Sequence, residues 1–320
     1  MATVQFPTMV DSNIDWDLLT QLSNFATPSG DEYELSEWIA RWTREHVASA
    51  TVRRLGDNLL VVKGDQPKVA VFAHLDTTGY TLGYENELIR IGSPSPEPDD
   101  LLRRVGHDFT ARITEGTLQS RTPLLDSAAN QPAGSRWVYA APIVIGADSV
   151  CGPYLDNRAG IWVALQALFS CNNIAVAFTS GEESSGHGAV VCGRYLTCEY
   201  GIHQAIISDM TWDTANVRRG NGPAISMRDS EVPRRRFLDH VVACAERSGV
   251  PFQIEVENSG GSDGTWLHSA GLPIDWVFVG APEKSPHTSH EDVLITDLTD
   301  MARLINALVD ALHMQPLNDY

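Results

Sequence analysis

The segment Lys68-Val-Ala-Val-Phe-Ala-His74-Leu-Asp76 is the most informative part of the sequence about the fold class. After Lys68 the run is apolar, without the polar alternation of a half-exposed strand, and it ends in His74 and Asp76. Continuous apolar strands are typical of a parallel sheet that helices cover on both faces. We therefore predict a buried parallel strand with polar side chains at its carboxyl end, where the ligands of open α/β sheets bind.

Three further apolar runs have the same design, and each leads into residues that can bind a metal. These are 174–179 before Glu182 and Glu183, 205–208 before Asp209, and 274–280 before His287. Apolar residues at helical spacing lie between or beside these runs. Helices are predicted at 16–25, 32–46, 157–169, 233–248 and 297–312. The predicted fold class is α/β, with a mostly parallel sheet flanked by helices.

The segment from 84 to 148 has a different character. It has no long helical period, it is interrupted by Ser93-Pro-Ser-Pro-Glu-Pro98, and it contains short alternating pieces at 109–113 and 137–145. Alternation over a few residues is typical of half-buried strands. We predict a small β-rich domain at 84–148, inserted into a catalytic domain formed by residues 1–83 and 149–320.

Composition excludes several classes of protein. The 320 residues include 41 acidic and 23 basic side chains, a net charge of −18 that disfavours nucleic acid as a partner. Every apolar run is far shorter than the ~20 residues of a membrane-spanning helix. Residues 1–13 lack the charged and apolar regions of a signal peptide. The five cysteines have no metal or redox spacing, so we expect free thiols and a cytoplasmic protein without membrane partners.

The carboxyl ends of parallel strands meet at one edge of a sheet, so the polar residues above should converge there. A fifth candidate, Asp156, lies in a turn just before a predicted helix. Each residue alone has a simpler explanation, such as a helix cap for Asp156 or a turn for Asp209. Together, two histidines and several carboxylates fit a two-metal hydrolytic site with ions ~3.5–4 Å apart.

The charges of such a site balance. Two divalent cations are neutralised by three ligand carboxylates and one bridging hydroxide. One glutamate of the pair Glu182 and Glu183 is then left over, and it can serve as the general base if it lies near the bridging water.

At this point the sequence resembles the cobalt- or zinc-activated aminopeptidases of the glutamyl and deblocking aminopeptidase family, which includes the tetrahedral aminopeptidases. The resemblance runs in order through most of the chain. Its segments are 27–32, 54–59, 74–76, 155–160, 181–183, 208–211, 220–225, 260–263 and 287–291. An insertion between His74 and Asp156 is similar to the domain arrangement of this family.

The resemblance implies a zinc-peptidase-like fold and a role for each site residue. His74 and Asp209 would bind one metal, Glu183 and His287 the other, and Asp156 would bridge them. Glu182 would be the general base, and Asp76 would orient His74 from behind. The resemblance also implies a cis peptide bond between Asp156 and Asn157.

The implied function is hydrolysis of N-terminal residues from peptides with a free N-terminus. Two divalent ions per chain are expected, zinc or cobalt first and manganese as a third option, in a homo-oligomer assembled through the inserted domain. A related dipeptidase or N-acyl amide hydrolase would use the same ligands and stays an alternative. A non-catalytic metal-dependent assembly protein is a further alternative. No Gly-x-Ser-x-Gly motif supports a serine hydrolase.

Overall fold

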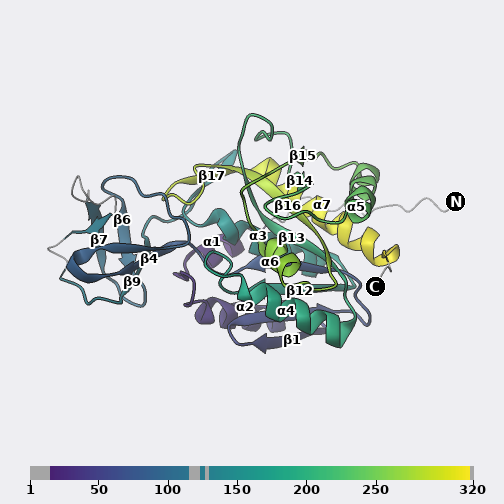
Figure 1. Cartoon of the computed structure of the whole chain (residues 1–320), viewed down its shortest axis with the longest axis horizontal. Helices are drawn as coiled ribbons and strands as arrows, with labels where there is room; N and C mark the ends of the chain where they lie inside the picture. The colour runs from purple at the N-terminus through teal and green to yellow at the C-terminus, as the bar shows by residue number, and fades with distance from the viewer. Residues whose placement is uncertain (1–14, 115–122, 127–129, 318–320) are drawn as a thin grey trace.

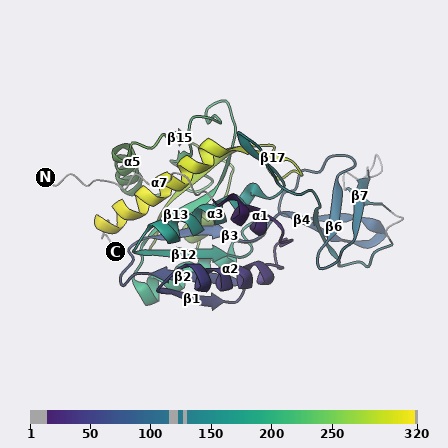
Figure 2. The same cartoon turned by 180° about the vertical axis from the view of Figure 1, so that it is seen from behind.

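The computed structural model describes residues 15–114, 123–126 and 130–317. The expectation that residues 1–13 form no signal peptide concerns a segment outside these residues. Within them the chain forms a large sheet with helices on both faces and a smaller sheet that projects from one end (Figures 1 and 2). No helix of the described ranges combines the length and apolar character needed to cross a bilayer.

The large sheet is mixed. Its central strands β12, β3, β13 and β16 run parallel to one another, and the other strands pair antiparallel, except that β15 is parallel to β14. The strands are β1 (Ala50–Leu55), β2 (Asn58–Lys63), β3 (Ala70–His74), β10 (Val144–Ile145), β11 (Ser149–Gly152), β12 (Ile174–Thr179), β13 (Gln204–Trp212), β14 (Ala224–Ser226), β15 (Gln253–Glu255), β16 (Asp275–Lys284) and β17 (Glu291–Leu294). The spatial order is β1-β2-β12-β3-β13-β16-β17-β11-β10, with β14 paired to β16 and β15 to β14.

The helices cover the two faces unequally. They are α1 (Trp16–Ser23), α2 (Tyr33–His46), α3 (Leu155–Ser170), α4 (His187–Tyr195), α5 (Arg235–Ser248), α6 (Asp263–Ser269) and α7 (Ile295–Met314), and a π-helical turn at Leu196–Tyr200 follows α4. In β3, Val71 and Ala73 pack into the larger core with α1, α2, α3, α5 and α7. Phe72 points the opposite way, into the core formed with α4 and α6. Both faces of the strand are therefore buried, as its continuous apolar sequence requires.

The smaller sheet is antiparallel, in the order β5-β4-β9-β6-β7-β8. Its strands are β4 (Gly79–Leu82), β5 (Leu88–Ile91), β6 (Leu101–Arg104), β7 (Thr110–Thr114), β8 (Leu124–Leu125) and β9 (Arg136–Tyr139), and a 3₁₀ turn at Tyr84–Asn86 joins β4 to β5. Burial alternates along β7, and a separate core forms around Tyr80, Leu102 and Trp137. The sheet thus has the half-exposed pattern expected of the insert.

The α/β fold with an additional β-rich unit is confirmed, but the boundaries of that unit differ from 84–148. The small sheet already includes β4, whose four residues carry no signal that separates them from the polar segment after β3. The piece predicted at 137–145 is two strands, since β9 belongs to the small sheet and β10 pairs with β11 of the large one. Pro142 lies between them, where a proline interrupts pairing.

Candidate metal centre and active site

The parallel strands bring the predicted site residues to one edge of the large sheet. His74 is the last residue of β3, Glu182 and Glu183 follow β12, and His287 lies in the loop between β16 and β17. Asp209 differs from expectation, because it lies inside β13, which continues to Trp212. Its position beside Gly280 of β16 still places its side chain next to the end of β3.

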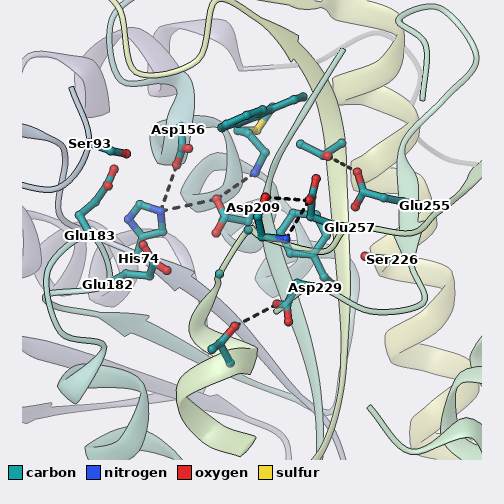
Figure 3. Close-up of a pocket in the computed structure, with 18 of the residues that line it drawn as sticks. His74, Ser93, Asp156, Glu182, Glu183, Asp209, Ser226, Asp229, Glu255 and Glu257 are labelled. Atoms are coloured by element: carbon teal, nitrogen blue, oxygen red, sulfur yellow. Dashed lines mark hydrogen bonds and ion pairs between the residues drawn. The ribbon is translucent and has the colours of Figure 1, made fainter. Parts of the chain in front are cut away.

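The side chains converge around Asp156, at the start of α3. His74 Nε2 lies 3.1 Å from Asp156 Oδ1 and 3.5 Å from Asp209 Oδ1 (Figure 3). On the other side, His287 Nε2 lies 3.3 Å from Asp156 Oδ2 and 3.8 Å from Glu183 Oε1. The cluster therefore forms two groups of three ligand-type residues, and Asp156 belongs to both.

The electrostatics of this cluster fit divalent cations. Burial raises the pKa of Glu183 well above its ordinary value and that of Asp209 to about 6. Burial would lower the pKa of His74, but the neighbouring Asp209 and Asp156 raise it well above its ordinary value. Glu183 Oε1 is buried without a hydrogen-bond partner. Crowded, desolvated carboxylates of this kind require cationic partners, and the imidazole and carboxylate donors suit zinc, cobalt or manganese.

Asp76 is fully buried and contacts both His74 and the turn after β12. The atom nearest to His74 Nδ1 is the Asp76 main-chain oxygen at 3.1 Å, while the carboxylate Oδ1 is 3.6 Å away. The carboxylate mainly holds the turn after β12, since it accepts hydrogen bonds from the amides of Glu182 at 3.0 Å and Glu183 at 3.1 Å. Ser29 Oγ donates to it at 2.6 Å. Asp76 therefore positions both glutamates as well as His74.

Glu182 belongs to neither ligand group, although it lines the same cavity. Burial raises its pKa well above the ordinary value of a carboxyl. Glu182 thus lies beside the candidate ligands, partly exposed to the cavity, without belonging to either group.

Several residues without a predicted role support the ligands. Glu291 Oε2 accepts a hydrogen bond from the Asp156 amide at 3.2 Å, and Glu32 Oε1 accepts one from the Gly181 amide at 3.0 Å. Ser93 Oγ lies 2.8 Å from His287 Nδ1, although the two residues are 194 positions apart. Glu32 and Glu291 lie in segments of family resemblance, whereas nothing in the sequence connects Ser93 to His287.

The backbone at the bridging position also agrees with expectation. The peptide bond between Asp156 and Asn157 is cis. The Asn157 side chain donates to the main-chain oxygen of Ser208 at 2.9 Å, which ties the start of α3 to β13 beside Asp209.

The model of the M42 glutamyl aminopeptidase family matches residues 132–304, more than half of the chain. The chain belongs to the M42 glutamyl aminopeptidase family. This M42 protein is an aminopeptidase by family, so the predicted enzyme class, a peptidase hydrolase, is confirmed. The resemblance expected from the ordered motifs is confirmed with it.

Known proteins are similar to this M42 aminopeptidase over nearly its whole length. A relative in Acetivibrio thermocellus that bears an aminopeptidase name is 25% identical over 91% of this chain and 97% of its own. The lysyl aminopeptidase of Pyrococcus furiosus is 21% identical over 93% of this chain and 98% of its own.

Solved structures show the same fold. The aminopeptidase of the archaeon Desulfurococcus kamchatkensis superposes with a TM-score of 0.81 at 19% identity, covering 95% of this chain and 97% of that one. The Pyrococcus horikoshii TET1 peptidase, which can assemble into a tetrahedron or a large octahedral shell, gives 0.77 at 21% identity over 92% and 98%.

Proposed function

We propose that this aminopeptidase removes N-terminal residues from peptides with a free N-terminus by two-metal hydrolysis. The observation that carries the proposal is the pair of ligand groups that share Asp156, each with one histidine and one further carboxylate. A single structural metal would need only one such group, and two groups with a common carboxylate are the arrangement of dinuclear hydrolases.

In this proposal His74 and Asp209 hold one divalent cation, and Glu183 and His287 hold the second. Asp156 would be the ligand shared by both, since its two oxygens each face a different histidine. Zinc or cobalt fits this donor set first, and manganese is a third option. Bound there, the two cations would polarise the scissile carbonyl and lower the pKa of the water that becomes the attacking hydroxide.

Glu182 is the proposed general base. It takes a proton from the attacking water and passes it to the leaving nitrogen, so one carboxyl serves both proton transfers. Two features support this role: the buried position in the cavity next to the ligands, and the Asp76 carboxylate, which fixes the Glu182 main chain.

One experiment separates this function from its alternatives. Purified protein is analysed for bound metal and then assayed with leucyl-anilide beside N-acetyl-leucine. We expect about two ions per chain, as the two ligand groups imply, and cleavage of the anilide only. Cleavage of the N-acyl substrate alone would identify an N-acyl amide hydrolase. Bound metal with neither reaction would indicate a metal-dependent assembly protein.

The small sheet is proposed to be a domain that mediates homo-oligomer formation with further copies of this chain. Its outer residues include exposed apolar side chains, with Ile89 54%, Leu101 40% and Phe109 36% accessible. Exposed apolar side chains of this kind can take part in an association surface. The cytoplasm is the proposed compartment, because all five cysteines are unpaired, as is usual in reducing compartments.

A further inference from the structure

The catalytic cavity continues beyond the ligand cluster to a second group of acidic side chains. The cavity has a volume of about 380 Å³, with His74, Asp156 and Glu183 at one end. Asp229, Glu255 and Glu257 lie at the other end, on the far side of Asp209 (Figure 3). We call these three residues the acidic wall. Among the described residues that line the cavity, none is a lysine or an arginine.

The three carboxylates of the acidic wall are held in place by hydrogen bonds, two of them with donors from distant segments and one with donors of its own loop. Asp229 Oδ2 accepts hydrogen bonds from Ser262 Oγ and Thr265 Oγ1, each at 3.0 Å, which ties Asp229 to the start of α6. Glu255 accepts from Thr211 Oγ1. Glu257 accepts from the Asn258 amide at 2.7 Å, and such main-chain donors lower its pKa. Glu255 and Glu257 are thus fixed acceptors that face the cavity without a basic partner.

The charge of the acidic wall is not used by the proposed chemistry. Two cations, three ligand carboxylates and one hydroxide already balance at the catalytic end. The carboxylates of the wall are therefore left without a counter-charge in a partly desolvated cavity. Burial raises the pKa of Asp229 and Glu255, so a cationic group of the substrate beside them would stabilise their charged form.

Two arginines near the site lie in the opposite direction, whereas Arg228, beside the wall, is outside the cavity lining and donates its Nε to the Asp229 main-chain oxygen at 3.1 Å. A neighbouring groove of about 550 Å³ shares Ser93 and Glu183 with the cavity, and Arg90 and Arg136 of the small sheet line it. The site is therefore asymmetric, with acidic residues on one side of the ligand cluster and arginines on the other. A peptide would place a basic N-terminal side chain toward the wall and its carboxyl-terminal part toward the arginines.

The cavity also has apolar surface suited to an aliphatic stem. Trp212, Trp266 and Phe278 line it together with the acidic wall. Lysine and arginine side chains lay their methylene groups along such surfaces while the charged end reaches polar partners. Aromatic faces add an attraction for the cationic head group.

We propose that the acidic wall makes this enzyme selective for peptides whose N-terminal residue is lysine or arginine. The side chain lies along the aromatic surface, and its cationic end is bound by Glu255 and Glu257. This inference rests on the proposed function, since it requires the N-terminal residue to enter this cavity.

The test compares two substrates that differ by one ammonium group. Lysyl-anilide and norleucyl-anilide have the same four-carbon side chain, and only lysine carries the charge. With metal-loaded enzyme we expect kcat/KM for lysyl-anilide to exceed that for norleucyl-anilide by about 10-fold or more, the size expected of a charge-assisted hydrogen bond. Glutamyl-anilide should be the poorest substrate of the three, because the wall repels it.

Isosteric variants assign the effect to the wall. Glu257 is partly exposed, so Glu257→Gln removes one charge with little risk to folding. Glu255→Gln removes the charge of the buried partner. Each should lower the lysyl-to-norleucyl ratio by about 10-fold. Glu246→Gln, an exposed position on α5 outside the cavity lining, is the matched control and should leave the ratio unchanged. Calorimetric binding of free L-lysine and L-norleucine gives the same comparison without turnover.

The failures are distinguishable. If norleucyl- or glutamyl-anilide is cleaved better than lysyl-anilide, the selectivity inference is overturned and the aminopeptidase function stands. A lysyl-to-norleucyl ratio that stays at the wild-type value in both wall variants also overturns it. If the metal-loaded enzyme cleaves no aminoacyl-anilide at all, the proposed function fails, and this inference fails with it.

Discussion

The two sheets of this protein differ in how far their faces are buried. In the large sheet, β3, β12 and most of β13 are buried on both faces, so polar side chains with free access occur only at or near the strand ends. In the small sheet, β7 alternates between exposed and buried residues, and one face remains on the surface. This difference explains why the proposed catalytic residues lie at one edge of the large sheet, whereas the small sheet exposes side chains along one of its faces.

The small sheet nevertheless takes part in the site. The segment after β5 places Ser93 against His287, and the Ser95 amide donates to the His287 main-chain oxygen at 2.9 Å. The proposed ligand residues thus come from the large sheet, its loops and α3, and one of them, His287, is contacted by the segment after β5. Four predictions test how far this division of roles extends.

The largest effect is expected at the catalytic edge. Glu182→Gln keeps the size of the side chain but removes the base, so turnover should fall by about 10²–10⁴-fold. Metal content and substrate binding should stay near wild type, as measured by metal analysis and KM. Nearly unchanged turnover would exclude Glu182 as the base. Loss of metal would mean that Glu182 and Glu183 have exchanged roles.

The next prediction compares the two cores. Leu165 in α3 and Leu102 in β6 are both fully buried, and Leu→Ala at such sites costs about 2–5 kcal/mol. Leu165→Ala should lower the stability of the whole catalytic unit. Leu102→Ala should instead raise hydrogen exchange mainly in β4 to β9, because the small sheet has its own core. Leu101→Ala, at the exposed neighbouring position, is the control. If Leu102→Ala raised hydrogen exchange equally in both sheets, the two sheets would form a single cooperative unit.

The stability of the protein is expected to depend on pH through Glu32, whose carboxyl group accepts a hydrogen bond from the Gly181 amide in the turn after β12. Burial raises the pKa of Glu32 to about 7, above its ordinary 4.5. A carboxyl with a raised folded-state pKa binds its proton more tightly in the folded protein, so its contribution to stability is present below pH ~4.5 and is lost as pH rises toward ~7.

The loss should be at most about 3 kcal/mol. In Glu32→Gln this part of the decrease in unfolding free energy between pH 5 and pH 8 should be missing, as measured by chemical denaturation. Glu34→Gln, exposed on the same helix, should keep the wild-type slope. An unchanged slope in Glu32→Gln would assign the effect to other groups.

The smallest effect is expected at the surface of the small sheet. Ile89→Lys places a charge on the proposed association surface and should weaken self-association by about 10-fold, the cost of one poorly placed interface charge. Sedimentation of the variant and the wild type at several concentrations measures this, with Val144→Lys at an exposed site of the large sheet as control. If Ile89→Lys and Val144→Lys assembled to the same extent, Ile89 of the small sheet would not lie in the interface.

Much of the fold could be predicted from local patterns. The four central strands have continuous apolar runs, and the helices α1, α2, α3, α5 and α7 have clear helical spacing. Helices α4 and α6 were not predicted, because glycines weaken the helical pattern. In α4, Gly188 is required by packing, since a Cβ there would lie 2.3 Å from the Ser180 main-chain oxygen. The reason for this glycine lies in a neighbour that sequence periodicity does not reveal.

Local patterns were enough to predict which side chains could bind metal and that most of them follow apolar strands, because hydrophobic periodicity is a local property. Which atoms meet depends on the packed fold. It turned the Asp76 carboxylate toward the amides of Glu182 and Glu183, brought Ser93 to His287, and gathered the acidic wall from separate loops. These contacts depend on how distant segments pack against one another, and that packing has no signature in the spacing of residues along the chain.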